Sequence, residues 1–195
     1  MEFQDVVRCR RMVRKFTDEP VSEESVQRIM RNAVRGPSAG FSQGQSFLVL
    51  RGESLKKFSE MFEWWSGEEA KTAPLVVIPF SAKKVYLDRY AEPDKAEAEL
   101  TEDRWPVPYW DIDTGMASLL ILQTAVDEGL GAVFFGTDRD TWPALREAFG
   151  VPEMYTPIGV IAIGHSAEEG ISEGASPLRR KRKPHGEMVH WDQWA

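Results

Sequence analysis

Residues 8–15 read RCRRMVRK and lead directly into Phe16. They carry five basic side chains and no acidic one, in a chain of 195 residues whose formal net charge is −7. A second basic run, RRKRK at residues 179–183, also contains no acid. Because such runs repel themselves, one interpretation is a pair of solvated arms. The other is that both runs meet on one small anion such as a phosphate, whose oxygens suit the rigid fork of arginine.

The remaining composition narrows the class of protein. A net negative charge argues against a nucleic-acid partner. Cys9 is the only cysteine, which excludes an internal disulfide and favours a reducing compartment. The N-terminus lacks the apolar run of a signal peptide, and no apolar stretch approaches the roughly 18 residues of a membrane span. We therefore expect a cytoplasmic protein that has no membrane or nucleic-acid partner.

The length suits a single domain over residues 1–195, and four short segments have the composition of β-strands. Continuous apolar runs at 74–80 and 157–164 are typical of strands covered on both faces. Shorter runs at 47–50 and 132–135 predict two more strands. Because predicted helices separate them, we expect an α+β fold of mixed α/β layers, with a central sheet of about four to five strands flanked by helices.

The predicted helices have recognisable starts and faces. Ser22 is placed to cap a helix that runs to Val34, with two acids in its first turn. The longest helix, at 110–128, is apolar nearly all round, so we expect it to be central or buried at a subunit interface. Further helices are predicted at 2–11, 55–65 and 141–149.

Residues 81–109 differ in character from the rest of the chain. They are densely charged and interrupted by aromatic side chains, and we interpret them as a lid or insertion that is partly helical. The tail at 176–195 ends in apolar residues, so we expect it to pack on a neighbour. Five aromatic residues are candidates either for packing within the lid or for contact with a substrate: Phe41, Tyr86, Tyr90, Trp105 and Tyr109.

The usual catalytic constellations are missing from the sequence. His185 and His190 are spaced one residue too far apart for the HExxH zinc pattern, so we expect no metal site. The chain has no G-x-S-x-G elbow, no P-loop and no dinucleotide fingerprint. Asp111 and Asp113 are interpreted as first-turn acids of a helix. This absence points to a bound cofactor that carries the chemistry, so we expect no catalytic side chain.

Four stretches resemble, in order, the motifs of the nitroreductase family. Residues 10–16 (RRMVRKF) resemble its R-R-S-x-R-x-F signature, and residues 36–43 (GPSAGFSQ) resemble its P-S-x-x-N-x-Q-P-W pattern. Residues 129–136 (GLGAVFFG) are similar to its G-L-G-x-x-x-x-G strand, and residues 180–184 (RKRKP) to its basic tail. The resemblance spans the whole chain except 81–109.

This resemblance implies an α+β fold and an intertwined homodimer with FMN at each subunit interface. Residues 37–39 are implied to reach that FMN from the other subunit, and the backbone at 135–136 to approach the flavin N5 atom. Eleven residues are implied to contact the cofactor: Arg10, Arg11, Met12, Arg14, Pro37, Ser38, Ala39, Phe135, Gly136, Arg180 and Arg182.

The resemblance gives the arginines distinct roles. Arg10 and Arg11 are implied to lie near the phosphate and the ribityl chain, and Arg180 and Arg182 to complete the grip on the phosphate. Arg14 is implied to lie near the pyrimidine edge of the flavin, where a cation stabilises the anion formed on reduction.

Departures from the family's motifs fall near the implied site. Its usual serine is Met12, its asparagine is Phe41, and its proline-tryptophan pair is Gly44-Gln45. The resemblance implies hydride transfer from NADH or NADPH through FMN to a small electron-poor acceptor, by a ping-pong mechanism. Nitroaromatics, quinones and activated alkenes are the candidate acceptors, and the departures leave the choice among them open.

Two alternatives are open at this point. One is a specialised branch of the same superfamily, either a reductive dehalogenase resembling iodotyrosine deiodinase or an oxygen-using enzyme that cleaves flavin. The 81–109 insertion, rich in tyrosine and lysine, keeps this alternative open. The other is a non-catalytic flavin carrier or redox sensor.

Overall fold

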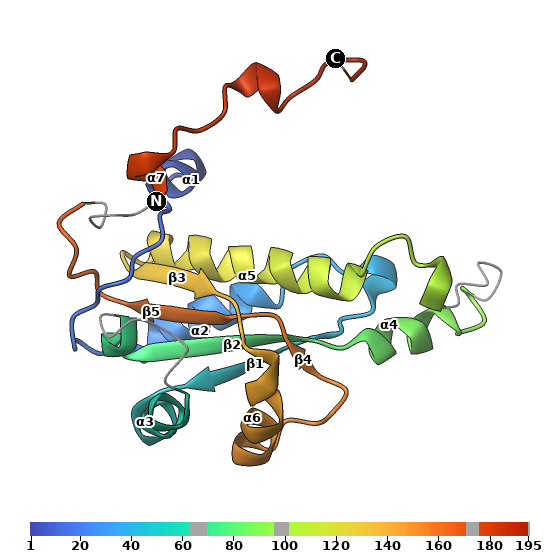
Figure 1. Ribbon diagram of the computed structural model, residues 1–195, viewed down its shortest axis with the longest axis horizontal. Coiled ribbons are helices and arrows are strands. Elements are labelled where there is room, and N and C mark those ends of the chain that lie inside the picture. Colours follow the sequence, from blue (N-terminus) through green and yellow to red (C-terminus); the bar gives the residue numbers. More distant parts are fainter. Residues whose placement is uncertain (63–69, 96–101, 171–175, 195) are drawn as a thin grey trace.

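The computed structural model describes residues 1–62, 70–95, 102–170 and 176–194. Its strands form one sheet in the order β1–β2–β5–β3, and β4 pairs with the end of β2 (Figure 1). All these pairings are antiparallel, and the expected α+β fold around one central sheet is confirmed. The strands are β1 (Gln45–Leu50), β2 (Leu75–Ser81), β3 (Gly131–Phe135), β4 (Thr156–Pro157) and β5 (Val160–Gly164).

The strand predicted at 157–164 is interrupted, and this part of the prediction is wrong. β4 and β5 both pair with β2, but at opposite ends of it. Between them, Gly159 packs so closely on Phe134 that an added Cβ would lie 2.3 Å from its ring. A residue with a side chain would not fit at this bend, which the apolar run alone did not reveal.

Helices cover both faces of the sheet (Figure 1). They are α1 (Phe3–Cys9), α2 (Glu23–Ala33), α3 (Gly52–Met61), α4 (Lys83–Tyr90), α5 (Tyr109–Asp127), α6 (Trp142–Phe149) and α7 (Ser176–Arg179). α2 and α5 pack on one face, where Ile29 and Ile121 are buried with Ile161. α3 and α6 pack on the other, where Phe58 and Leu145 are buried. The sheet therefore lies between two apolar cores.

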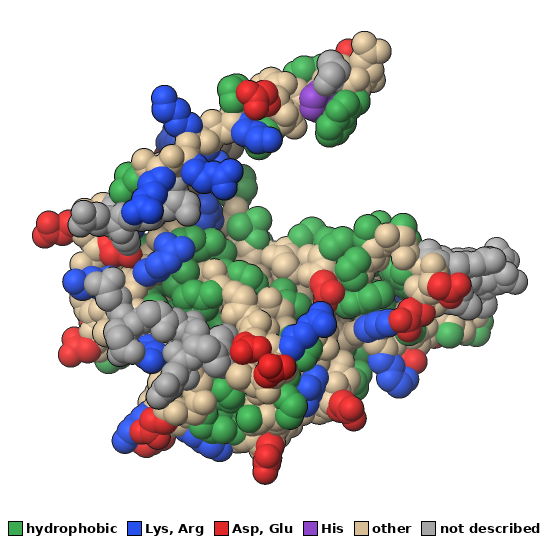
Figure 2. Space-filling model, in the orientation of Figure 1, with side chains coloured by type: hydrophobic (Ala, Val, Ile, Leu, Met, Phe, Trp, Pro, Cys, Tyr) green, Lys and Arg blue, Asp and Glu red, His purple; other side chains and the backbone are tan. Residues whose placement is uncertain are grey.

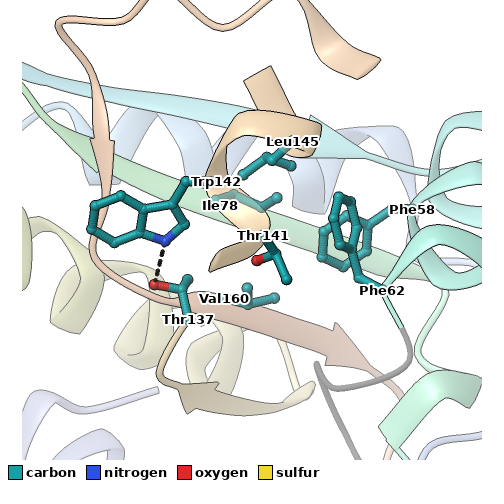
Figure 3. A pocket seen from close by; sticks show the side chains of 8 residues that line it. All are labelled: Phe58, Phe62, Ile78, Thr137, Thr141, Trp142, Leu145 and Val160. Carbon is teal, nitrogen blue, oxygen red and sulfur yellow. Dashed lines mark hydrogen bonds between the residues drawn. The ribbon is translucent and has the colours of Figure 1, made fainter. Parts of the chain in front are cut away.

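The space between α3 and α6 belongs to the second of these cores. Phe58, Phe62 and Leu145 converge there (Figure 3). At its edge the Trp142 Nε1–H donates to the hydroxyl of Thr137 (3.1 Å). The remaining gap is too narrow to admit a water molecule, so no ligand is assigned to it.

The segment at residues 10–16 follows α1 and runs along the sheet. The Val13 N–H donates to the Ala132 carbonyl (2.9 Å), and Phe16 forms an antiparallel bridge with Ser166. Because Val13 and Phe16 are buried, they fasten the segment to the sheet and leave its basic side chains half-buried or exposed.

The C-terminal tail lies outside this layered body. Beyond α7 it extends away from the sheet (Figure 1), and nearly all of its described residues are exposed. Within the described residues, no helix is long and apolar enough to cross a membrane. Short 3-10 turns complete the chain at Ala39–Phe41, Ala70–Thr72, Glu102–Arg104, Arg139–Thr141 and His185–Glu187.

Candidate functional site

The segment at residues 10–16, which we name the basic motif, lies at the outer edge of the sheet, beside β3. Arg10 follows the end of α1 and is half-buried, while Arg14 is exposed. The side chains of Arg10 and Arg14 form no ion pair or hydrogen bond with any residue that the structure describes. Met12 instead packs against both cores and bridges to Ala132. Two arginine charges are therefore available to an anion at this edge.

Arg11 differs from its neighbours because it is already paired. Its guanidinium forms an ion pair with Glu168, whose side chain is only 5% exposed. The same carboxylate accepts hydrogen bonds from the backbone N–H groups of Arg14 (2.5 Å) and Lys15 (3.2 Å). Glu168 therefore holds the shape of the motif and offsets one of its charges, although no local sequence pattern indicated it.

β3 leads from the basic motif to the glycine that was predicted to approach a flavin. Met12 bridges to Ala132 near the start of the strand, and Gly136 follows its end. Ala132 and Gly136 are four residues apart, which is roughly 13 Å in an extended chain. A Cβ added at Gly136 would meet nothing within 4 Å, and Phe135 beside it is half-buried. This edge suits an elongated ligand with one anionic end.

A pocket next to Arg11 lies at the same edge of the sheet, beside the start of β3. It has a volume of about 200 Å³, and its lining includes Cys9, Arg11, Leu130, Gly131 and Ser166. Residues 129–131 (GLG), which resemble part of the family's motifs, therefore lie beside the basic motif, although the two segments are far apart in the sequence.

The loop at 37–39 is placed at the opposite end of α5. The Ala39 N–H donates to a carboxylate oxygen of Asp113 (2.8 Å), in the first half of this helix. Asp113 precedes Asp127, the last residue of α5, by fourteen positions, roughly 21 Å along the helix axis. The pocket beside Arg11 is lined by residues next to that far end. In one chain, the loop and the pocket beside Arg11 therefore lie toward opposite ends of α5 (Figure 1).

The tail arginines are also separate from the basic motif. Arg180 and Arg182 are exposed, and neither forms an ion pair with the described part of the chain. Figure 2 shows basic side chains gathered on the first part of the tail. The structure thus leaves these charges free, but no contact joins them to Arg10.

The five aromatic candidates separate into two groups. Tyr86 is fully buried, and Tyr90, Trp105 and Tyr109 are half-buried. Their rings pack at steep angles, with those of Tyr90 and Trp105 4.8 Å apart between centroids. For these four, the contacts favour packing within the insertion over contact with a substrate. Phe41, in contrast, is 76% exposed.

α5 presents an apolar stripe to solvent, which we name the α5 stripe: Ile112, Met116 and Leu119. These side chains are 40%, 38% and 45% exposed, and their spacing places them on one helical face. Figure 2 shows hydrophobic side chains along the edge of the body that faces the tail. Contiguous exposed apolar surface of this kind marks interaction sites in proteins.

These features define an α+β protein with a candidate ligand site at the β3 edge of its sheet. At this edge, Arg10 and Arg14 lack ion-pair partners among the described residues, and Gly136 has open space beside it. The chain matches the Nitroreductase family over residues 7–165, and it belongs to that family. The resemblance inferred from its motifs is thereby confirmed.

Named relatives agree with this assignment. A protein from Methanothermobacter thermautotrophicus is 32% identical over 199 residues, covering 100% of this chain and 88% of its own, and bears the provisional name NADH dehydrogenase/NAD(P)H nitroreductase. A provisionally named nitroreductase from Desulfovibrio desulfuricans, solved in complex with FMN, has a TM-score of 0.73 at 21% identity, covering 100% and 99% of the two chains. A third, from Exiguobacterium sibiricum and also in complex with FMN, has a TM-score of 0.74 at 19% identity, covering 98% and 97%. At these identities the two structures show the shared fold.

Proposed function

We propose that this protein is an FMN-dependent oxidoreductase that uses NADH or NADPH to reduce a small electron-poor acceptor in a ping-pong cycle. The observation that carries the proposal is the edge of β3, where Arg10 and Arg14 lack partners among the described residues and Gly136 is open. Family membership supports it, as do the names of the relatives and the FMN held by two structures of the same fold.

The residues of this edge suit FMN in their charge and shape. Arg10 would bind the phosphate together with Arg180 and Arg182, since a phosphate monoester accepts paired hydrogen bonds from guanidinium groups. Arg14 would place a positive charge by the pyrimidine edge, and the open backbone at Gly136 would allow close approach of a planar ring. When bound, FMN supplies reversible hydride chemistry between the nicotinamide donor and the acceptor. We assign no side chain as an acid or base in the cycle.

A second copy of the chain is part of this proposal. The loop at 37–39 and the basic motif lie toward opposite ends of α5, and this separation supports contributions to one FMN from different subunits. The α5 stripe and the tail, with Trp191 and Trp194 74% and 88% exposed, provide apolar surface for such a homodimer to bury. The proposed organisation is a single domain over residues 1–195, with 81–109 as a lid or insertion and 176–195 as a C-terminal tail. The proposed location of the protein is the cytoplasm.

Steady-state turnover separates an enzyme from a flavin carrier. With a quinone in excess, the protein is expected to oxidise many equivalents of NADH or NADPH per bound flavin, because the quinone regenerates the oxidised cofactor in each cycle. The measurement is the loss of nicotinamide absorbance, with free FMN at the same concentration as the control. Oxidation that stops after one equivalent per flavin, with both donors, would mean that the protein only carries the flavin.

A further inference from the structure

The segment that follows β5 pairs with the end of the basic motif. The Thr17 N–H donates to the His165 carbonyl, and the Ala167 N–H donates to the Lys15 carbonyl, each at 2.9 Å. The motif is thereby fastened twice, by this segment and by its hydrogen bond to β3. The next residue along the segment is Glu168, which this pairing brings beside the arginines of the motif.

Glu168 contacts the motif with both of its carboxylate oxygens. The Oε2 atom accepts from the guanidinium of Arg11, whereas the Oε1 atom accepts from the backbone N–H groups of Arg14 and Lys15. The side chain of Glu168 is 5% exposed, so these bonds are largely shielded from water. One carboxylate therefore does two separable things: one oxygen fixes the backbone of the motif, and the other neutralises a guanidinium.

This contact separates Arg11 from its neighbours in the motif. The side chains of Arg10 and Arg14 form no ion pair with described residues, so an anion would be their first partner. The Arg11 side chain is 33% exposed, and an anion arriving from solvent would compete with Glu168 for it. Removing Arg11 from Glu168 leaves a buried carboxylate without its cation, which is strongly destabilising. The geometry thus favours Arg10 over Arg11 as a phosphate ligand, although the resemblance implied both.

We propose that Glu168 is a positioning residue of the flavin site that acts on FMN binding in two opposite directions. Its hydrogen bonds to the backbone hold the basic motif in its binding shape, which strengthens the binding of FMN. Its charge withholds Arg11 from the phosphate, which weakens it. This rests on the proposed function, since the basic motif is taken there to bind FMN. It deepens that function by naming the residue that limits how tightly the anionic cofactor is held.

Glu168→Gln separates the two effects. The amide oxygen of glutamine can still accept from the two backbone N–H groups, but its NH2 group cannot accept from Arg11, and the negative charge is gone. Arg11 is then released toward solvent. At low salt we expect FMN to bind roughly 3- to 10-fold more tightly than in the wild type, because one more guanidinium can reach the phosphate.

Glu168→Ala removes both effects at once. It also releases Arg11, but the backbone of the motif loses two hydrogen bonds and must be ordered when the cofactor binds. This variant should therefore bind FMN roughly 5- to 30-fold more weakly than Glu168→Gln, the range expected for one or two hydrogen bonds. If Glu168→Ala does not fold, the comparison of Glu168→Gln with the wild type still decides the sign of the charge effect.

The measurement is the dissociation constant of FMN, obtained by diluting the flavin-loaded protein and following the fluorescence of released flavin. It is made at low salt and at about 1 M salt, where the screening length falls to roughly 3 Å. The tighter binding of Glu168→Gln should disappear at high salt, whereas the difference between the glutamine and alanine variants should persist. A residue that only supports the fold would give no salt-dependent gain in affinity.

Two controls connect the gain to Arg11. Glu169→Gln removes the same charge from the next residue, which is exposed, and should change the FMN dissociation constant by less than about 2-fold. In the double variant Arg11→Ala with Glu168→Gln, the gain should be absent, because no guanidinium is left to release.

Unchanged or weaker FMN binding in Glu168→Gln at low salt would overturn the inference and leave Glu168 with a structural role alone. A gain that persists in the double variant, or an equal gain in Glu169→Gln, would overturn it as well, because the effect would then not pass through Arg11. Wild-type protein that binds no FMN would instead overturn the proposed function itself.

Discussion

Replacing Arg10 or Arg182 with alanine is expected to weaken FMN binding by roughly 10- to 150-fold in each case. Each change removes hydrogen bonds to a charged phosphate, which contribute roughly 1.5–3 kcal/mol. Neither side chain has an ion-pair partner among the described residues, so the loss would not reflect a broken ion pair within that part of the chain. Arg11→Ala would be less informative, because it also leaves the buried Glu168 without its cation.

The double variant and two controls complete this test by flavin-fluorescence titration. Since Arg10 and Arg182 would share one anion, the free-energy changes of the single variants should not add in the double variant. Arg179→Ala and Lys183→Ala, on the same exposed tail, should change affinity little, because solvated charges contribute little. Four small and similar effects would indicate a solvated basic arm in place of a phosphate grip.

Leu119→Glu is expected to dissociate the dimer. The α5 stripe would be buried between subunits, and a carboxylate placed there would be desolvated without a partner, which costs several kcal/mol and corresponds to a dissociation constant raised at least about 100-fold. Because each flavin site would need both subunits, bound FMN should fall with the dimer. Sedimentation at low micromolar concentration should show twice the chain's 22.1 kDa for the wild type and one chain for the variant.

Lys56→Glu is the control for this experiment. Lys56 is exposed on α3, which covers the other face of the sheet, so an acidic change there should leave both mass and flavin content unaltered. A wild-type protein that sediments as a well-folded monomer with bound flavin would contradict the shared site, as would a Leu119→Glu variant that stays dimeric.

The elements with local signals were predicted well from the sequence. Ser22 caps α2 as expected, accepting the Ser25 N–H (3.1 Å), and the apolar run at 74–80 became β2, which is buried throughout. In α5, the sequence pattern predicted the helix but not which of its apolar residues are buried. Its apolar pattern covers nearly every side, so periodicity could not separate Ile121, which lies in the core, from Leu119, which faces solvent.

The contacts that shape the candidate site could not be predicted in this way. Arg11 and Glu168 are separated by 157 residues, and Ala39 and Asp113 by 74. Such pairs depend on how the sheet brings distant segments together, and no local spacing encodes them. The motifs indicated candidate cofactor residues, whereas the fold alone showed that the 37–39 loop and the basic motif lie toward opposite ends of α5.

The cofactor itself is tested by the visible absorbance spectrum of the purified protein, followed by mass analysis of the cofactor released on denaturation. We expect an oxidised-flavin spectrum and the release of FMN, because the basic groups suit one terminal phosphate and the sequence has no dinucleotide fingerprint. Release of FAD, or a colourless protein that binds no FMN when it is supplied, would contradict FMN as the cofactor of this protein.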